Sequence, residues 1–269
     1  IETNNGIFSE VCNFLGSLVN CGYSQNYRFI PYGLDSYLPV NKIYFGSKNF
    51  EVKFPFNTKY GGMVSIKEYR NITNAGMMDG FLQLPFEFII SQSFEYINRT
   101  VAISNIQLQQ RRLIQSEDVA VSQIQEIDEA LDATMSGRFA FGKHHLSIMC
   151  TDDNMKSIEN DLSMIIVEFS NIGITAVRER LNMEASFWAQ LPGNFSYVVR
   201  GATINTLNLA SFVSFHNYPT GKIKRNHWGP AVTVLNTVSG TPFFFNFHVR
   251  DVGHTMIIGP TGSGKTVTM

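Results

Sequence analysis

The sequence has no long apolar run, no excess of one charge and no paired cysteine motif. No stretch reaches the roughly 18 uninterrupted apolar residues that a membrane-spanning helix needs. Lysine and arginine number 21 against 22 acidic residues, a formal net charge of −1, whereas a dedicated nucleic-acid-binding domain is usually clearly basic. Cys12, Cys21 and Cys150 are an odd set without C-x-x-C spacing, which indicates a reducing compartment. We therefore expect a globular, cytoplasmic chain.

What is present is an alternation of strand and helix patterns along 269 residues. The spacing of apolar side chains predicts an amphipathic helix over 154–173 and one long helix within 98–136, which lacks proline and glycine. Apolar and aromatic runs predict four strands, over residues 63–69, 86–94, 144–150 and 174–180. These patterns favour an α+β fold, in which a mixed sheet is accompanied by a long helix.

A domain boundary is expected near residues 217–230, which contain two prolines and two glycines. We predict an N-terminal α+β domain over residues 1–225 and a second domain from 226 to 269. Residues 231–248 have the pattern of a hairpin with its turn near Ser239 and Gly240, and residues 254–258 that of a short strand.

The predicted short strand leads directly into a glycine-rich loop. Gly259 to Thr266 reads G-P-T-G-S-G-K-T, which fits the phosphate-loop pattern G-x-x-x-x-G-K-[ST]. The glycines allow consecutive backbone N–H groups to surround phosphate oxygens. We expect Lys265 to reach the β- and γ-phosphates of a nucleotide and the Thr266 hydroxyl to bind Mg²⁺. The predicted binding residues are Gly259, Pro260, Thr261, Gly262, Ser263, Gly264, Lys265 and Thr266, with Lys265 as the catalytic residue.

Two further clusters are candidate sites. His144, His145 and Cys150 match no zinc spacing, which favours an ordinary position on a strand or at the surface. The basic run 222–225, K-I-K-R, is typical of a solvated loop, with contact to nucleic acid or anionic lipid as the alternative.

Nucleotide hydrolysis also needs an acidic residue for Mg²⁺ and a group that orients water, both normally C-terminal to the loop. The chain has only three residues after Thr266 and begins with Ile1. We expect an internal fragment of a longer protein, in which 226–269 supply the first strands and the phosphate loop of a truncated RecA-like α/β domain.

Three stretches near the C-terminal end resemble a known family, the CagE/TrbE/VirB ATPases of bacterial type IV secretion systems. They are F-W-A-Q-L-P-G-N at 187–194, N-T-L-N-L-A-S-F at 205–212, and 216–266, where W-G-x-A and D-x-G-H-T precede the loop. Weaker similarities lie upstream, and residues 1–60 are the least diagnostic. The resemblance implies that residues 259–266 bind ATP and Mg²⁺ in a P-loop ATPase that energises substrate transfer or pilus assembly, as in conjugation and protein secretion.

The resemblance also implies roles for the N-terminal domain. It would dock the motor to inner-membrane components of the apparatus and support self-association into a hexamer or dimer, peripherally on the cytoplasmic side of the bacterial inner membrane. A HerA/FtsK-like DNA translocase is the alternative, because it shares the order of hairpin, strand and loop; the near-neutral charge does not support a nucleic-acid partner. The isolated 269 residues would be a docking module without turnover.

Overall fold

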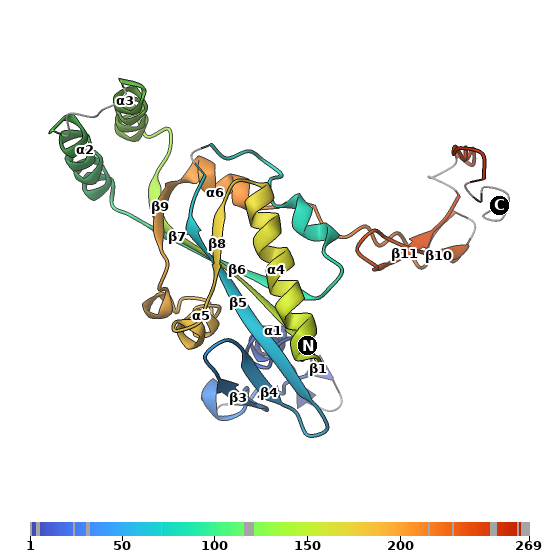
Figure 1. Ribbon diagram of the computed structural model, residues 1–269. Coiled ribbons are helices and arrows are strands. Elements are labelled where there is room, and N and C mark those ends of the chain that lie inside the picture. Colours follow the sequence, from blue (N-terminus) through green and yellow to red (C-terminus); the bar gives the residue numbers. More distant parts are fainter. Residues whose placement is uncertain are drawn as a thin grey trace. The chain divides into compact units, whose positions relative to one another are not determined.

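The computed structural model describes two compact units of the chain (Figure 1). One unit comprises residues 1–81 and 86–214, and the other comprises 82–85 and 215–269. By its internal contacts the chain divides after Ser214. The boundary at residue 225 between an N-terminal domain and a nucleotide-binding domain stays a prediction. The described residues are 2–3, 6–23, 25–30, 33–70, 72–115, 121–214, 216–227, 229–247, 252–262 and 264.

The first unit is built on a seven-stranded sheet. Five strands follow the order β3–β4–β5–β7–β6, while β8 pairs with β5 and β9 pairs with β7. The strands are β3 (Lys42–Phe45), β4 (Phe50–Lys53), β5 (Thr58–Glu68), β6 (Phe88–Tyr96), β7 (Phe141–Asp152), β8 (Thr175–Arg178) and β9 (Ala202–Asn205). A separate pair of very short strands, β1 (Glu2–Thr3) and β2 (Gly6–Ile7), lies near the N-terminus.

The α+β class and the four predicted strands are confirmed, but the prediction of a mixed sheet is wrong. Every pairing between the described strands is antiparallel. The chain does cross over from β7 through α4 (Met155–Asn171) to β8. However, β5 lies between β7 and β8 and runs antiparallel to both. A strand–helix–strand pattern in the sequence predicts that the helix connects two strands of one sheet. It does not predict whether a third strand, here β5, lies between those two strands.

The predicted amphipathic helix is α4, and its apolar stripe forms part of the core. Asn154 caps its first turn by accepting a hydrogen bond from the Lys156 N–H at 2.9 Å. The buried side chains recur at helical spacing and are Ile158, Leu162, Ile165 and Phe169. A Cβ at Gly62 of β5 would lie 2.5 Å from Leu162, so glycine there lets the helix approach the sheet closely.

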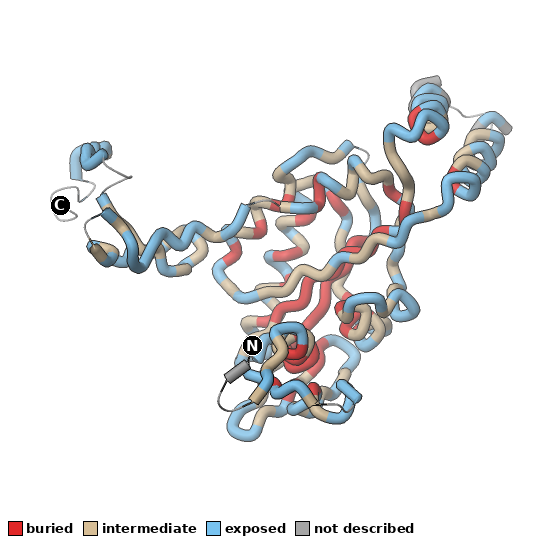
Figure 2. The backbone as a smooth tube through the Cα atoms, turned by 180° about the vertical axis from the view of Figure 1, so that it is seen from behind, coloured by how far each residue is buried: buried red, intermediate tan, exposed pale blue. Residues whose placement is uncertain are grey.

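Helix α5 (Met183–Trp188) contributes to a second cluster of buried side chains. Met183 and Phe187 pack there with Met63 of β5 and Met149 of β7. The buried residues therefore concentrate on the central strands β5 and β7, as Figure 2 shows. The remaining helical elements are α1 (Glu10–Val19), α6 (Thr206–Phe212), η1 (Leu34–Ser36), η2 (Asp79–Gln83) and η3 (Phe195–Tyr197).

The single long helix predicted within residues 98–136 is wrong. The structure has two helices there, α2 (Arg99–Gln115) and α3 (Val121–Met135), which pack against each other. A continuous helix of that length would extend about 57 Å and leave its apolar stripe in water. Because the two helices pack side by side, each covers part of the other's apolar stripe. The Gln110 side chain donates a hydrogen bond to the Asp128 carboxylate at 2.5 Å between the helices. Gly137, with φ of 73°, follows α3 and ends the helix in the left-handed conformation common at C-terminal caps.

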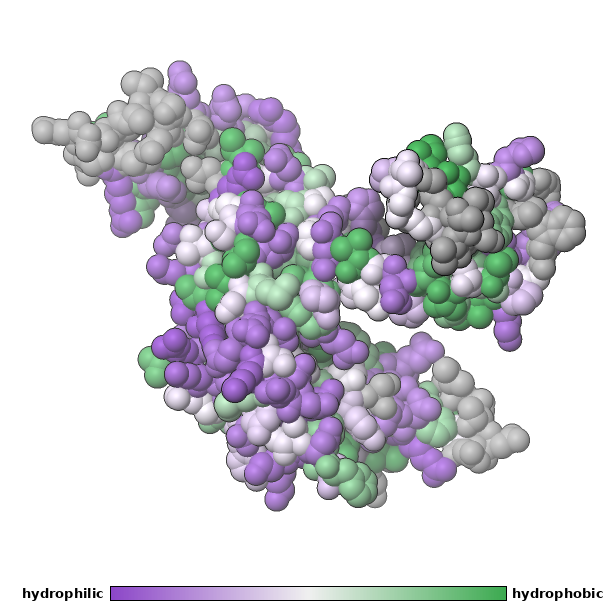
Figure 3. All heavy atoms as spheres, turned by 45° about the vertical axis from the view of Figure 1, so that its right-hand side comes forward, coloured by the Kyte–Doolittle hydropathy of each residue, from purple (hydrophilic) through white to green (hydrophobic). Residues whose placement is uncertain are grey.

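In the second unit the predicted hairpin is confirmed as β10 (Thr233–Asn236) paired with β11 (Pro242–Phe245). Its turn contains Gly240, with φ of 77°, whose N–H donates to the Thr237 carbonyl at 3.0 Å. All four β10 side chains are exposed. Figure 3 shows apolar side chains gathered on the visible surface of this unit.

The strand predicted over residues 254–258 is not formed. These residues have no regular secondary structure, and Met256 and Ile258 are 77% and 84% exposed. A strand is stable only when a neighbour satisfies its backbone hydrogen bonds. The described part of the second unit offers no strand that pairs with this segment, which explains why the local pattern failed.

Candidate functional site

The predicted phosphate loop lies in the second unit, immediately after the exposed segment 252–258. Gly259 is half-buried, and Pro260, Thr261, Gly262 and Gly264 are exposed. Three predicted binding residues, Ser263, Lys265 and Thr266, lie outside the described residues. The roles given to the whole set stay predictions.

Two glycines of this loop have backbone conformations that disfavour other residues. Gly262 has φ of 83° and Gly264 has φ of 79°. A Cβ at either position would meet nothing within 4 Å, so crowding does not demand glycine there. The left-handed backbone itself favours glycine. Left-handed residues are common in the backbone concavities that bind anions.

In the first unit, His144 of β7 is fully buried and both of its ring nitrogens have partners. Nδ1 lies 2.9 Å from the Tyr69 hydroxyl, and Nε2 lies 3.1 Å from Gln92 Oε1. Because the amide oxygen accepts from Nε2–H, the hydroxyl donates to Nδ1 and the ring is satisfied in its neutral form. Burial, with a smaller contribution from the adjacent His145, lowers the pKa of His144 to about 4. This network is structural.

The metal alternative for His144, His145 and Cys150 receives no support. Among the described residues no three histidine, cysteine or acidic side chains are placed to hold a metal ion. The three residues lie on β7, as the strand interpretation expected, and all are buried. Cys12, Cys21 and Cys150 are free and buried, and burial raises the pKa of the Cys21 and Cys150 thiols to about 12.

Glu179, just after β8, forms an ion pair inside the first unit. Its carboxylate is 1% exposed and accepts from Arg200 Nε at 2.5 Å. The Arg200 carbonyl in turn lies 3.1 Å from His145 Nδ1. The pair therefore fixes the segment before β9 to the end of β8.

A second ion pair joins Arg178 of β8 to Glu159 of α4. Arg178 also donates to Asn49 Oδ1 at 2.5 Å, which connects the turn before β4. The hydrogen bond from Arg178 is the main reason that the pKa of Glu159 falls to about 2. The sequence predicted a strand over 174–180, but nothing in its pattern indicated these partners.

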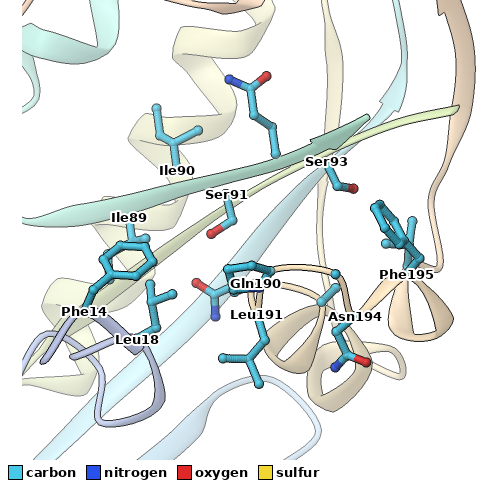
Figure 4. Close-up of a pocket in the computed structure, with 15 residues that line it drawn as sticks. Phe14, Leu18, Ile89, Ile90, Ser91, Ser93, Gln190, Leu191, Asn194 and Phe195 are labelled. Atoms are coloured by element: carbon cyan, nitrogen blue, oxygen red, sulfur yellow. The ribbon is translucent and has the colours of Figure 1, made fainter. Parts of the chain in front are cut away.

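A hollow of about 370 Å³ lies beside β6 in the first unit (Figure 4). Its walls come from β6, from α1 and from residues 189–195 after α5. The floor includes Gln190, which is 7% exposed and whose Oε1 has no hydrogen-bond partner. Nothing in the sequence pattern of residues 189–195 indicated this hollow.

The sequence model of the CagE, TrbE, VirB family, described as a component of the type IV transporter system, matches residues 1–200. The chain therefore belongs to this family, as the sequence resemblance predicted. The match includes residues 1–60, which the resemblance treated as least diagnostic, and ends before the phosphate loop.

Curated relatives extend the similarity through the loop. The type IV secretion system protein virB4 of Bartonella henselae is 41% identical over 97% of this chain. Protein virB4 of Rhizobium radiobacter is 34% identical over 100% of it, and the type IV secretion system protein PtlC of Bordetella pertussis is 35% identical over 92%. The chain spans about a third of each relative, with coverages of 33%, 34% and 31% respectively.

The chain is thus a component of a type IV secretion system. None of the helices in the described residues combines the length and the apolar character that crossing a bilayer requires.

Proposed function

We propose that this chain is part of an ATP-driven motor subunit of a type IV secretion system, which energises substrate transfer or pilus assembly. The observation that carries the proposal is the phosphate-loop sequence at Gly259–Thr266 in a member of this family. The positive φ angles of Gly262 and Gly264 support it, because they are the backbone conformations that a phosphate cradle uses.

The proposed ligand is ATP with Mg²⁺, and the chemistry is phosphoryl transfer to water. Residues 259–264 would surround the phosphates with backbone N–H groups. Lys265 would place a positive charge at the β- and γ-phosphates, and Thr266 would offer its hydroxyl to Mg²⁺.

Residues 226–269 are proposed as the opening of a RecA-like α/β domain, with the hairpin of β10 and β11 ahead of the loop. Hydrolysis would require the acidic and water-orienting groups that lie C-terminal to such loops. We therefore propose that turnover is a property of the complete protein.

The first unit is proposed as the docking part, because its described polar networks are structural and it carries no phosphate loop. Docking would be to inner-membrane components of the apparatus and to further copies of the subunit, as a hexamer or a dimer. The proposed location is peripheral, on the cytoplasmic side of the inner membrane.

A HerA/FtsK-like DNA translocase is the second candidate. The basic run 222–225 favours it, since all four residues are exposed. The formal net charge of −1 counts against it.

The test is ATP turnover by the complete protein with and without DNA. Lys265→Ala is expected to abolish turnover, because the phosphates lose their charge-assisted contact. Lys156→Ala, which removes an exposed lysine of the first unit, is the matched control and should turn over ATP normally. Unchanged turnover in Lys265→Ala would overturn the assignment of the loop, while strong stimulation by DNA would favour the translocase.

A further inference from the structure

Helices α2 and α3 form a pair that has little core of its own. They connect β6 to β7 (Figure 1), and each packs mainly against the other. Among their residues whose burial is described, α2 buries Ala102 and α3 buries Ala133 and Thr134. Helix α4, by contrast, buries four large apolar side chains. Helices of this length are marginal in water without apolar cover. The pair therefore presents helix faces that a partner could cover.

The outward face of α2 combines apolar and basic side chains. Val101 and Leu108 lie two helical turns apart and are 49% and 42% exposed. Arg111 and Arg112 follow Leu108 by three and four residues, so they share its face, and both are exposed. With Arg99, they give α2 three positive charges and no negative charge. A partner for this face must cover apolar side chains and supply negative charge.

The outward face of α3 carries the opposite charge. Asp128, Glu129 and Asp132 are exposed at helical spacing, and the exposed Met135 extends the same face. The sequence of α3 contains four acidic residues and no basic residue. Asp132 already pairs with Arg138, which follows the helix. Among the described residues, Asp128 and Glu129 form no ion pair, so they can accept a basic partner.

The two charged faces lie level with each other along the helix pair. Because Gln110 of α2 donates to Asp128 of α3 at 2.5 Å, the next two residues of α2 lie level with Asp128 and Glu129. No ion pair between described residues joins α2 to α3. Arg111 Nε instead donates to the Gln107 carbonyl of its own helix. Both charged faces thus remain available to a partner that carries both signs.

We propose that the α2–α3 pair is an interface between two copies of this chain, in which α2 of each copy packs against α3 of the other. Two such pairs, side by side and pointing the same way, form four helices in which every neighbour is antiparallel. Arg111 and Arg112 of one copy then lie level with Asp128 and Glu129 of the other. Twofold symmetry repeats this contact, and Leu108 gains apolar cover within it.

A second copy is the occupant that the charges favour. A membrane with anionic headgroups or a nucleic acid would attract the basic face of α2, but it would repel the acidic face of α3 beside it. A second copy offers both signs at the matching level.

The proposal names the surface for the self-association proposed above for the first unit, and it rests on that role. It involves no residue of the phosphate loop. Nucleotide binding is therefore tested separately.

The test measures self-association of the complete protein by sedimentation velocity over a series of concentrations. Arg111→Glu with Arg112→Glu makes α2 acidic, and Asp128→Lys with Glu129→Lys makes α3 basic. Each double variant is expected to raise the dissociation constant about tenfold or more, because both contacts of the symmetric interface become repulsive. An equal mixture of the two variants should associate within about threefold of the original protein, because each altered helix then faces the opposite charge.

The matched control is Lys42→Glu with Lys156→Glu. Both lysines are exposed in the first unit and lie outside α2 and α3, and their reversal changes the net charge as the α2 variant does. The dissociation constant should change by less than about twofold, because general charge effects are screened by salt. Circular dichroism checks that each variant is folded. Should a double variant lose helix, the single reversals Arg112→Glu and Glu129→Lys form the mixture instead.

Three results would overturn the proposal: a complete protein that stays monomeric, double variants that associate as tightly as the original protein, or a mixture that does not regain association. These results also separate this interface from the broader role. Association that persists in both variants would remove only this interface and leave self-association in place. A monomeric complete protein would remove both.

Discussion

The two units differ in where they keep their apolar side chains and their chemistry. In the first unit, Phe169 and Leu162 are buried and two ion pairs connect separate elements. In the second, Val238 is 87% exposed, and the same unit carries the phosphate-loop sequence. The buried core and the proposed nucleotide chemistry thus lie in different parts of the chain. Substitutions should therefore separate the two properties.

Removing a core aromatic ring is expected to give the largest difference between the two units in the effect of a substitution on the free energy of unfolding. Phe169 is fully buried and its ring lies 4.8 Å from that of Phe81. Phe169→Ala is expected to lower the free energy of unfolding by about 3–5 kcal/mol, because it leaves a cavity. Val238→Ala in the second unit should change it by less than about 0.5 kcal/mol. Urea denaturation of the complete protein measures both, and equal effects would contradict the comparison.

Acid should weaken the first unit through His144. Its pKa is lowered to about 4 from 6.5, so the unfolded chain binds more protons between these values. Stability is thus full above about pH 6.5 and falls as pH drops toward 4, by on the order of 3 kcal/mol from this group. His144→Phe is expected to flatten this part of the stability–pH profile. A profile unchanged by His144→Phe would show that another group carries the effect.

Breaking the buried ion pair should cost less than the ring deletion. Glu179→Ala leaves Arg200 without its carboxylate, but the Arg200 side chain is 33% exposed and keeps some water. We expect a loss of about 2 kcal/mol, below the range for fully buried pairs. Asp132→Ala breaks the exposed pair with Arg138, whose side chains are 75% and 65% exposed, and should cost about 0.5 kcal/mol or less. Thermal denaturation that ranks the two variants in reverse would refute this reasoning.

A glycine substitution in the loop should act on nucleotide affinity. Gly262→Ala places a Cβ on a backbone with φ of 83°, which costs about 1 kcal/mol and should weaken ATP binding about fivefold. Gly201→Ala, where a Cβ would meet only Val198 at 3.8 Å, is the control and should bind ATP normally. Equilibrium titration with a fluorescent ATP analogue measures both variants. If Gly262→Ala and the original protein bind the analogue equally well, the positive φ of Gly262 does not contribute to nucleotide binding.

Local patterns predicted those parts of the fold that depend on local interactions. The helix α4 follows from its apolar spacing, and the β10–β11 hairpin from its turn near Gly240. The patterns failed where distant segments decide the outcome. Helices α2 and α3 fold back on each other, and β5 inserts between β7 and β8. Residues 254–258 have no strand neighbour in the described part of their unit.

The candidate sites divide in the same way. The phosphate loop was predicted because one contiguous motif contains all its residues. The hollow beside β6 joins α1, β6 and residues 189–195, which are far apart in the sequence. Gln190 could not be identified from the sequence, because it stands out only through the burial of its Oε1 atom without a hydrogen-bond partner.

The most direct test of the central claim is the affinity of the complete protein for a fluorescent ATP analogue with Mg²⁺. Lys265→Ala is expected to weaken binding about a hundredfold, through loss of a charge-assisted contact to the phosphates. Lys156→Ala in the first unit is predicted to leave the affinity unchanged. Equal affinity of Lys265→Ala and the original protein would contradict the placement of nucleotide binding in the second unit.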